Sequence, residues 1–358
     1  MENRIIAKRV IPLVEVSPGK LLVYKNAKLG IFNVNDYNIK WVGKLNIGIL
    51  RKILGYSSLA CRRFGLNEIK AANVDREQVL INYHGKFYLL NLKNDNLIKE
   101  IKSDSTWGKR VLSMSSTSHG IVMGEYGYNP EKNPMRIFIY DKNSHEIKTL
   151  YTFPKGYINH IHNIVEDKIT GRIWILTGDF GDSAAIYYTD DFFSTVKCSI
   201  RGDQSCRACL GISKNNILYY VTDSPLVVNN ICKLEDGKIK KLYEVNGSCI
   251  YGVNLDNKMI FSTTVENQTN ELNNNKNRYK YNLGKGIKDW YVEIIEYDIE
   301  KNIKKIIIRN RKDILPMIPF QYGCYRFPQN RINSKYLFCY GQAIKKHGSY
   351  LVMFNIDK

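Results

Sequence analysis

The sequence predicts an all-β fold, a β-propeller of seven four-stranded blades, from three observations. Short runs rich in β-branched and aromatic residues recur along the 358 residues, and turn sequences such as KNDN, KNSH, EDGK and IEKN separate many of them. Corresponding positions at Arg62, Arg110, His160, Arg207 and Ile250 lie 48, 50, 47 and 43 residues apart. No helical periodicity interrupts this pattern. Repetition of four strands at such a period is typical of a β-propeller.

The repeat is clearest between His160 and Lys197. HIHNIVED alternates polar and apolar residues, RIWILTGD is rich in β-branched and aromatic residues, and AAIYYTDD begins a third run. With this stretch as a template, seven units are expected in one domain over residues 1–358. Their approximate limits are 10–46, 58–103, 107–153, 157–201, 204–246, 247–309 and 318–357.

Three of these units need separate comment. The second is expected to begin with a strand at Cys61, CRRFGLNEIKAAN, and the third with a strand at Lys109, KRVLSMSST. The sixth carries a polar insertion from about Gln268 to Lys288.

The last unit has three strands of its own. A spare strand at residues 4–10 is expected to complete it, which would close the ring and cover two exposed sheet edges. A six-bladed ring is the alternative if the N-terminal unit is irregular.

Charge favours an anionic partner. The chain has 53 Lys and Arg against 34 Asp and Glu, a formal net charge of +19, spread along its length. An acidic glycan is the expected partner. The basic residues form no obvious stripe with interleaved aromatics, so nucleic-acid binding is not expected. Codon bias in an AT-rich genome is the alternative source of the Lys, Asn and Ile-rich composition.

The remaining compositional features predict a cytoplasmic protein. MENRIIAKRVIPLVEV lacks the apolar core and cleavage site of a secretory signal, and no segment approaches the length of a membrane span. Eight irregularly spaced cysteines do not form a disulfide scaffold, and Cys206 and Cys209, the one CxxC pair, are expected to be buried and apolar. The sequence does not indicate an oligomeric state.

Propeller geometry is expected to gather residues from several blades at one rim. Guanidinium groups that converge there suit the bidentate capture of a carboxylate. The alternative for each arginine is a salt bridge between blades. The expected substrate-binding residues are Arg63, Arg110, Arg207, Asp223, Tyr251 and Arg326.

Two histidines at the start of one strand are candidate catalytic residues. Because His160 and His162 are two residues apart, both rings are expected to project from the same face. They suit acid–base chemistry, or metal binding with a third group such as Glu125 or Asp179. No cofactor or metal is predicted, and a divalent metal at these histidines is the lesser alternative. The structural alternative is a hydrogen bond to a neighbouring blade.

Carboxylates that follow the second strands complete the predicted catalytic set. Glu125 and Tyr126 lie in GEYGYNP, where a partly buried carboxylate would act as a general acid. Asp179 in LTGD and Asp223 in VTDSP occupy matching places in consecutive units, and two such carboxylates could form the pair that glycoside hydrolysis requires. The alternative is that each carboxylate binds backbone amides of its own turn.

A turn motif in the fourth unit carries a resemblance to a known family. Thr189, Asp191 and Thr195 match the Asp-box, Ser/Thr-x-Asp-x-Gly-x-Thr-Trp, with Phe193 in place of Gly and Val196 in place of Trp. Residues 107–235 resemble sialidase-like, BNR-repeat propellers of bacteria, some of which are associated with surface-polysaccharide genes. The resemblance implies a carbohydrate-active propeller in which the Asp-box serves the fold.

Three functions follow as expectations. A glycoside hydrolase acting on an acidic polysaccharide or oligosaccharide is slightly favoured. A polysaccharide lyase is the first alternative, with a histidine or tyrosine that removes the proton α to a uronate carboxylate while Arg207 neutralises that carboxylate. A non-catalytic propeller that binds a glycan or a protein is the second.

Overall fold

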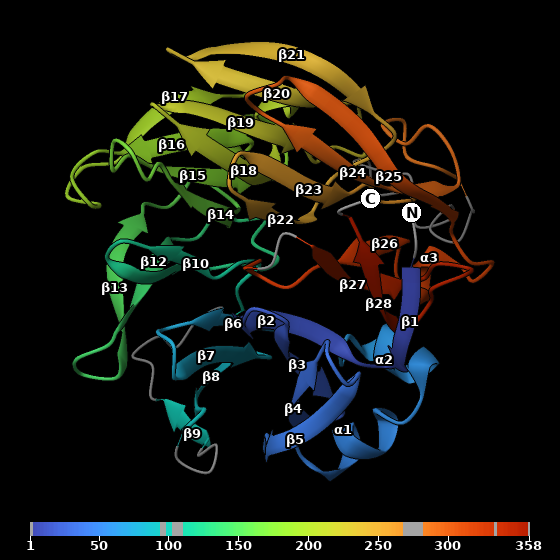
Figure 1. Ribbon diagram of the computed structural model, residues 1–358. Coiled ribbons are helices and arrows are strands. Elements are labelled where there is room, and N and C mark those ends of the chain that lie inside the picture. Colours follow the sequence, from blue (N-terminus) through green and yellow to red (C-terminus); the bar gives the residue numbers. More distant parts are fainter. Residues whose placement is uncertain (1–2, 94–97, 102–109, 268–281, 333–334, 357–358) are drawn as a thin grey trace. The chain divides into compact units, whose positions relative to one another are not determined.

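The computed structural model describes residues 3–93, 98–101, 110–267, 282–332 and 335–356 (Figure 1). These residues form seven four-stranded antiparallel sheets, which confirms the seven-bladed β-propeller; the six-bladed alternative is wrong. The chain packs into two compact units. Unit 1 comprises residues 1–68, 225–229 and 245–358, and unit 2 comprises residues 69–224 and 230–244. The expectation of one domain over residues 1–358 stays a prediction.

Unit 2 contains four sheets whose strands neighbour one another in chain order. They are β6 (Ile69–Asn73), β7 (Gln78–Tyr83), β8 (Lys86–Asn91) and β9 (Ile98–Ile101); β10 (Ser115–Thr117), β11 (Gly120–Gly124), β12 (Met135–Asp141) and β13 (Glu146–Phe153); β14 (His160–Glu166), β15 (Ile173–Gly178), β16 (Ala185–Thr189) and β17 (Lys197–Arg201); and β18 (Ala208–Lys214), β19 (Ile217–Thr222), β20 (Asn229–Glu235) and β21 (Lys238–Val245).

Unit 1 contains three sheets. They are β2 (Ile11–Ser17), β3 (Lys20–Lys25), β4 (Lys28–Asn33) and β5 (Asn38–Lys44); β22 (Tyr251–Leu255), β23 (Lys258–Ser262), β24 (Tyr291–Asp298) and β25 (Ile303–Arg311); and β26 (Cys324–Arg326), β27 (Tyr336–Gln342) and β28 (Tyr350–Asn355), completed by β1 (Asn3–Lys8). Strand β1 pairs antiparallel with β28, so the N-terminal strand completes the last sheet as predicted.

The expected strand at Cys61 is wrong. Two short helices, α1 (Ile49–Leu54) and α2 (Ser58–Phe64), occupy this region, and the sheet begins at Ile69. The Ser57 hydroxyl caps α2 by accepting a hydrogen bond from the backbone amide of Ala60 at 3.3 Å, and Gly65 ends it with a φ of 61°. A serine cap and a terminal glycine are local signals that the strand prediction overlooked.

Further boundaries also differ from the predictions. Strand β10 spans only Ser115–Thr117, and Lys109, where it was expected to begin, lies outside the described residues. Most of the insertion between Gln268 and Lys288 lies outside them as well. A third helix, α3 (Met317–Phe320), and two 3-10 turns, η1 (Gly181–Ser183) and η2 (Gln204–Cys206), complete the described elements.

Apolar side chains pack between successive sheets of unit 2 and place β14 beside its neighbours. Val122, Ile161 and Ile175 belong to one buried cluster, and Trp174 and Tyr220 belong to the next. A Cβ atom on Gly124 would lie 2.3 Å from Cγ2 of Ile161, so glycine is needed for this close approach. Complete burial of an apolar side chain such as Ile161 or Ile175 stabilises the fold by about 1.5–3 kcal/mol.

The predicted burial of the CxxC pair is confirmed. Cys206 and Cys209 are buried, and all eight cysteines are free thiols. Among the described residues, no helix is both long enough and apolar enough to cross a membrane.

Candidate functional site

A β-bulge at the start of β14 builds the centre of the candidate site. In the pairing with β15, His160 lies opposite Gly178, Ile161 opposite Thr177 and Asn163 opposite Leu176, so His162 is the extra residue. The Nε2 atoms of His160 and His162 lie 2.9 Å apart. The two rings therefore lie together, as predicted. Both the β-bulge and the alternation of side chains along the strand bring them together.

Backbone carbonyl groups hold the other side of each imidazole ring. Nδ1 of His160 lies 2.9 Å from the carbonyl oxygen of Gly127, and Nδ1 of His162 lies 2.9 Å from that of Ala208. A Cβ atom on Gly178 would lie 2.2 Å from Cε1 of His162, so the ring packs directly on the glycine. Both rings are thereby fixed with their Nε2 atoms facing each other.

Asp179 follows β15 and closes the centre. Its Oδ1 atom lies 3.3 Å from Nε2 of His160 and 3.7 Å from Nε2 of His162. Burial favours a raised pKa for Asp179, but hydrogen bonds with the two histidines and the charge of Arg207 outweigh it and hold the pKa well below its usual range. For His162, burial lowers the pKa despite the hydrogen bond with Asp179. A carboxylate thus lies beside a neutral imidazole.

Arg207, just before β18, links two carboxylates. Its Nη2 atom lies 3.2 Å from Oδ1 of Asp179, and its Nε atom lies 3.3 Å from Oδ2 of Asp223. Asp223 is only 2% exposed. The guanidinium group is therefore already paired on two sides, although Asp179, with a side chain 31% exposed, leaves one side of the centre open.

Cys209 occupies in β18 the bulge position that His162 occupies in β14. Its Sγ atom donates a hydrogen bond to Oδ2 of Asp223 at 3.3 Å. Burial first, and then the charge of Asp223, raise the pKa of the Cys209 thiol well above its usual value. The thiol therefore stays protonated and serves as a donor to the carboxylate.

Tyr126 and Arg110 border the imidazole pair. The ring centroid of Tyr126 lies 4.5 Å from that of His160, and its backbone amide donates to the carbonyl oxygen of Arg110 at 3.0 Å. Arg110 is exposed. Both predicted residues lie near the centre, one through its ring and the other through its backbone.

Glu125 is buried, but its carboxylate is directed at Arg136. Oε2 accepts hydrogen bonds from the backbone amide and from Nε of Arg136 at 2.8 and 3.1 Å, and Oε1 accepts one from Nη2 at 2.7 Å. The backbone carbonyl of Glu125 accepts from the amide of Ile161. The Glu125 carboxylate is thus held in a buried ion pair with Arg136.

The other predicted binding residues belong to unit 1. Arg326 is buried and forms an ion pair with Glu68 at 3.1 Å, and its guanidinium group lies 5.4 Å from the ring centre of Tyr251. Burial raises the pKa of Tyr251. Arg63 is exposed on α2 beside Phe64. Within unit 1, Arg326 and Tyr251 lie together, whereas Arg63 is on the exposed helix surface.

Two contacts at the centre were not predicted. Nε2 of Gln204 donates to the backbone carbonyl of Asp179 at 3.0 Å, and the Phe180 ring lies 5.1 Å from the guanidinium carbon of Arg207. Gln204 precedes Arg207 by three residues in DQSCR, and this closeness to a predicted binding residue could have drawn attention to it. The carbonyl groups that hold the histidines have no signal in the sequence, because every residue carries one.

The turn that matches the Asp-box lies between β16 and the outer strand β17. Oδ1 of Asp191 accepts from the Thr189 hydroxyl and from the Thr195 amide, both at 2.8 Å, and Oδ2 accepts from the Thr195 hydroxyl at 2.7 Å. The Phe193 amide donates to the Thr189 hydroxyl at 2.9 Å. The motif thus stabilises a hairpin turn, in keeping with a role in the fold.

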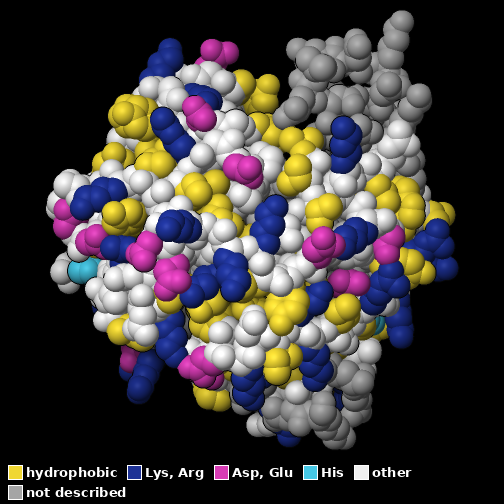
Figure 2. All heavy atoms as spheres, turned by 90° about the horizontal axis from the view of Figure 1, so that it is seen from above, with side chains coloured by type: hydrophobic (Ala, Val, Ile, Leu, Met, Phe, Trp, Pro, Cys, Tyr) yellow, Lys and Arg dark blue, Asp and Glu magenta, His cyan; other side chains and the backbone are white. Residues whose placement is uncertain are grey.

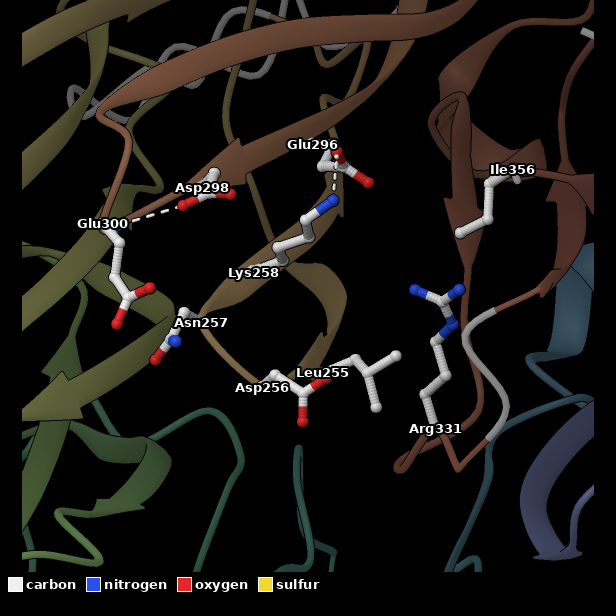
Figure 3. Close-up of a pocket in the computed structure, with 9 residues that line it drawn as sticks. All are labelled: Leu255, Asp256, Asn257, Lys258, Glu296, Asp298, Glu300, Arg331 and Ile356. Carbon is white, nitrogen blue, oxygen red and sulfur yellow. Dashed lines mark hydrogen bonds and ion pairs between the residues drawn. The ribbon is translucent and has the colours of Figure 1, made fainter. Parts of the chain in front are cut away.

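A separate pocket of about 240 Å³ lies in unit 1 (Figure 3). Several of its charged groups have structural partners: Lys258 pairs with Glu296 at 3.1 Å, and the Asp298 carboxylate accepts from the backbone amide of Glu300 at 3.1 Å. No histidine is among the described residues that line this pocket, in contrast to the centre in unit 2. On the face drawn in Figure 2, basic side chains of the described residues are scattered among acidic, apolar and uncharged groups.

Comparisons with known proteins support the fold. No family model matches the chain, and no curated protein sequence matches it significantly. Among solved structures, virginiamycin B lyase from Staphylococcus aureus matches with a TM-score of 0.60 at 10% identity, over 99% of this chain and 98% of that one. Oligogalacturonate lyase from Vibrio parahaemolyticus matches with 0.55 at 9% identity, over 99% and 94%.

A second oligogalacturonate lyase, in complex with manganese, matches with a TM-score of 0.53 at 8% identity, over 99% of this chain and 93% of that one. Likeness at such low identity shows a shared β-propeller fold alone. The sialidase-like, BNR-repeat resemblance thus stays a prediction beyond the fold itself.

Proposed function

We propose that unit 2 carries the active site of an enzyme that cleaves an acidic glycan by β-elimination. One observation carries the proposal: His160, His162, Asp179 and Arg207 converge beside Tyr126, a phenol able to transfer protons. The net charge of +19 supports an anionic substrate. The two oligogalacturonate lyases among the structural neighbours are compatible with this chemistry.

Elimination suits these groups better than hydrolysis, the function slightly favoured by the sequence. Glycoside hydrolysis requires two carboxyl groups on either side of the scissile bond, one of them a general acid. Glu125 is engaged by Arg136, and Asp179 and Asp223 both pair with Arg207. None of the three is arranged as a free general acid, so the lyase becomes the leading proposal.

The proposed reaction assigns roles to the residues as follows. Arg207, the cation of the centre, neutralises the uronate carboxylate and thereby acidifies the proton α to it. Tyr126, as its phenolate, accepts that proton, and the electron pair of the broken C–H bond forms the new carbon–carbon double bond as the glycosidic C–O bond breaks. The Tyr126 phenol then returns the proton to the leaving glycosidic oxygen. Arg110, which is exposed near Tyr126, supplies a further cation for binding the substrate.

The test compares the wild type with Tyr126→Phe and the matched control Tyr128→Phe, whose side chain is 92% exposed. Each protein is incubated with a panel of uronate-containing oligosaccharides while reducing ends and the absorbance of unsaturated uronates are followed. We expect both signals from wild type and control, and a fall in kcat of roughly 100-fold or more in Tyr126→Phe. Reducing ends without absorbance would indicate a hydrolase, and binding without cleavage would indicate a non-catalytic glycan-binding propeller.

A further inference from the structure

The hydrogen bonds of the two imidazole rings leave the lone pairs of their Nε2 atoms facing each other. Each neutral imidazole has one N–H donor and one acceptor nitrogen. Because a carbonyl oxygen accepts only, Nδ1 of both His160 and His162 carries the proton. Both Nε2 atoms are then acceptors, 2.9 Å apart, with the carboxylate of Asp179 beside them. Three acceptors at one point repel one another, and a positive ion between them removes this repulsion.

The spacing of the three acceptors fits a metal ion. The distances between His160 Nε2, His162 Nε2 and Asp179 Oδ1 are 2.9, 3.3 and 3.7 Å. A point about 1.9 Å from all three atoms exists inside this triangle, close to the roughly 2.0–2.2 Å at which nitrogen and carboxylate ligands bind zinc. An ion slightly above the triangle would lie at the ligand distance from each atom.

We propose that His160 Nε2, His162 Nε2 and Asp179 Oδ1 bind a divalent transition-metal cation. Two imidazoles and one carboxylate suit zinc, manganese, cobalt or iron better than magnesium or calcium. Three protein ligands leave further positions for water or substrate, and the 31% exposed side chain of Asp179 keeps that side accessible. Nδ1 contacts to backbone carbonyls orient the rings in the way that is common for metal-binding histidines.

Arg207 and the neighbouring cysteine bear on the choice of this site. Arg207 pairs with the Asp179 carboxylate at 3.2 Å, and Gln204 donates to the Asp179 backbone carbonyl at 3.0 Å, so both position Asp179. A second group, His162, Cys209 and Asp223, also lies close together, but all three residues are buried and the Cys209 thiol donates to Asp223. In the histidine–Asp179 group Asp179 is partly exposed, so this is the group that is open to an ion and a substrate.

The cation also solves an electrostatic problem of the proposed function, on which this step rests. With neutral imidazoles, Asp179, Asp223 and Arg207 give the centre a formal charge of one negative unit, which would repel a uronate. A divalent cation reverses that charge and supplies a Lewis acid for the substrate carboxylate.

The test measures metal binding directly. Tag-free wild-type protein is stripped with chelator and titrated calorimetrically with Mn²⁺, Co²⁺ and Zn²⁺, with elemental analysis of the dialysed complexes. We expect one bound ion per chain, and an affinity at least 100-fold lower in Asp179→Asn and His162→Gln. The control His119→Gln changes an exposed histidine that stacks on Phe192 and should bind as the wild type does.

Thermal unfolding without metal checks that the variants are folded, and a metal-dependent rise in Tm confined to wild type and His119→Gln is a second expected result. No bound ion in the wild type would overturn the proposal in favour of a proton shared by the two imidazoles. Equal binding by a folded Asp179→Asn would overturn it by showing that the ion binds elsewhere. Metal binding without glycan cleavage would contradict the proposed function and leave the metal site intact.

An independent observation concerns the helices of unit 1. Helix α1 buries none of its side chains, and Ile49, Leu50 and Ile53 are 76%, 69% and 62% exposed. Tyr56, on the turn between α1 and α2, is also exposed. With Leu59 and Phe64 of α2, these residues form an exposed apolar surface, here called the helical patch. Such surfaces commonly mark interaction sites.

The charge around the helical patch indicates which kind of partner suits it. Between Asp36 and Glu68 the chain has no acidic residue, whereas Arg51, Lys52 and Arg63 lie on the two helices themselves. Arg62 anchors α2 by pairing with Asp313 at 2.5 Å and donating to the carbonyl of Phe320 at 2.7 Å. Basic residues interspersed with exposed apolar ones suit an anionic lipid surface. We propose that the helical patch docks on such a membrane surface.

Vesicle sedimentation tests this proposal. We expect the wild type to bind vesicles that contain phosphatidylglycerol at least tenfold more tightly than vesicles of phosphatidylcholine alone, with weaker binding at high salt. Leu50→Glu/Ile53→Glu should lose this binding. Ile169→Glu/Ile303→Glu, which changes two exposed isoleucines elsewhere, should keep it. Unchanged binding by the helical variant, or concentration-dependent dimers that this variant abolishes, would overturn the proposal; the second result would assign the patch to another copy of the chain.

Discussion

Gly178 and His162 lie so close together that no methyl group fits between them. A Cβ atom at Gly178 would meet the His162 ring at 2.2 Å from Cε1 and 2.5 Å from Nε2. The ring is held from the other side by the Ala208 carbonyl. The geometry of the two histidines therefore depends on a residue with no side chain.

Gly178→Ala should displace the His162 ring. Because the ring cannot retreat without breaking the hydrogen bond to Ala208, we expect a loss of stability of about 1–3 kcal/mol, as for an overpacked core. Urea unfolding measures the change. Gly127→Ala is the control, since its Cβ would meet no atom within 4 Å. Equal stability of the two variants would mean that the ring moves freely.

Glu125→Gln separates a structural role from a catalytic one. The substitution removes the charge from a carboxylate that is 1% exposed and weakens its bonds to Arg136, so we expect a loss of about 1–3 kcal/mol in unfolding free energy. Activity per folded molecule should remain within about twofold of the wild type. A fall of about 100-fold in kcat with unchanged stability would restore Glu125 as a general acid.

The repeat predicted the fold more completely than the site. Successive units share strand spacing, so some first strands could be placed from the sequence, as His160 in β14 shows, whereas the first strand expected at Cys61 could not. His160 and His162 could be paired for the same reason. Their hydrogen bonds to the carbonyl groups of Gly127 and Ala208 could not be predicted, because backbone partners depend on how neighbouring sheets pack.

Local contacts modify what the position of a residue predicts. The place of Glu125 at a strand end makes it a candidate acid, but Arg136, eleven residues later, binds its carboxylate across the β11–β12 pairing. The spacing of Arg62 predicts a strand, which is wrong, because Ser57 and Gly65 cap a helix there. Periodicity locates a unit, and local capping and cross-strand contacts decide the role of a residue within it.

Arg62→Ala should loosen α2 from the segment that contains Asp313. The change removes an ion pair and a hydrogen bond to Phe320 from a side chain that is 8% exposed, so we expect a loss of about 2–4 kcal/mol. Arg63→Ala is the matched control, because Arg63 is exposed on the same helix and should change stability by less than about 0.5 kcal/mol. Proteolysis of the α1–α2 segment should increase in the first variant only; equal cleavage of both would contradict the anchoring role.

His347 should make unit 1 less stable in mild acid. Its side chain is buried with Nδ1 2.8 Å from the Tyr325 hydroxyl, and burial first, then the charge of Lys346, lowers its pKa to about 4. The unfolded chain has the ordinary histidine pKa of about 6.5 and so binds more protons than the folded chain between these values. Stability is therefore full above about pH 6.5 and falls as the pH decreases toward 4, by about 1.4 kcal/mol per pH unit. Urea unfolding at pH 7 and pH 5 should show a smaller difference in His347→Gln than in the wild type, and equal differences would rule out this histidine as the source.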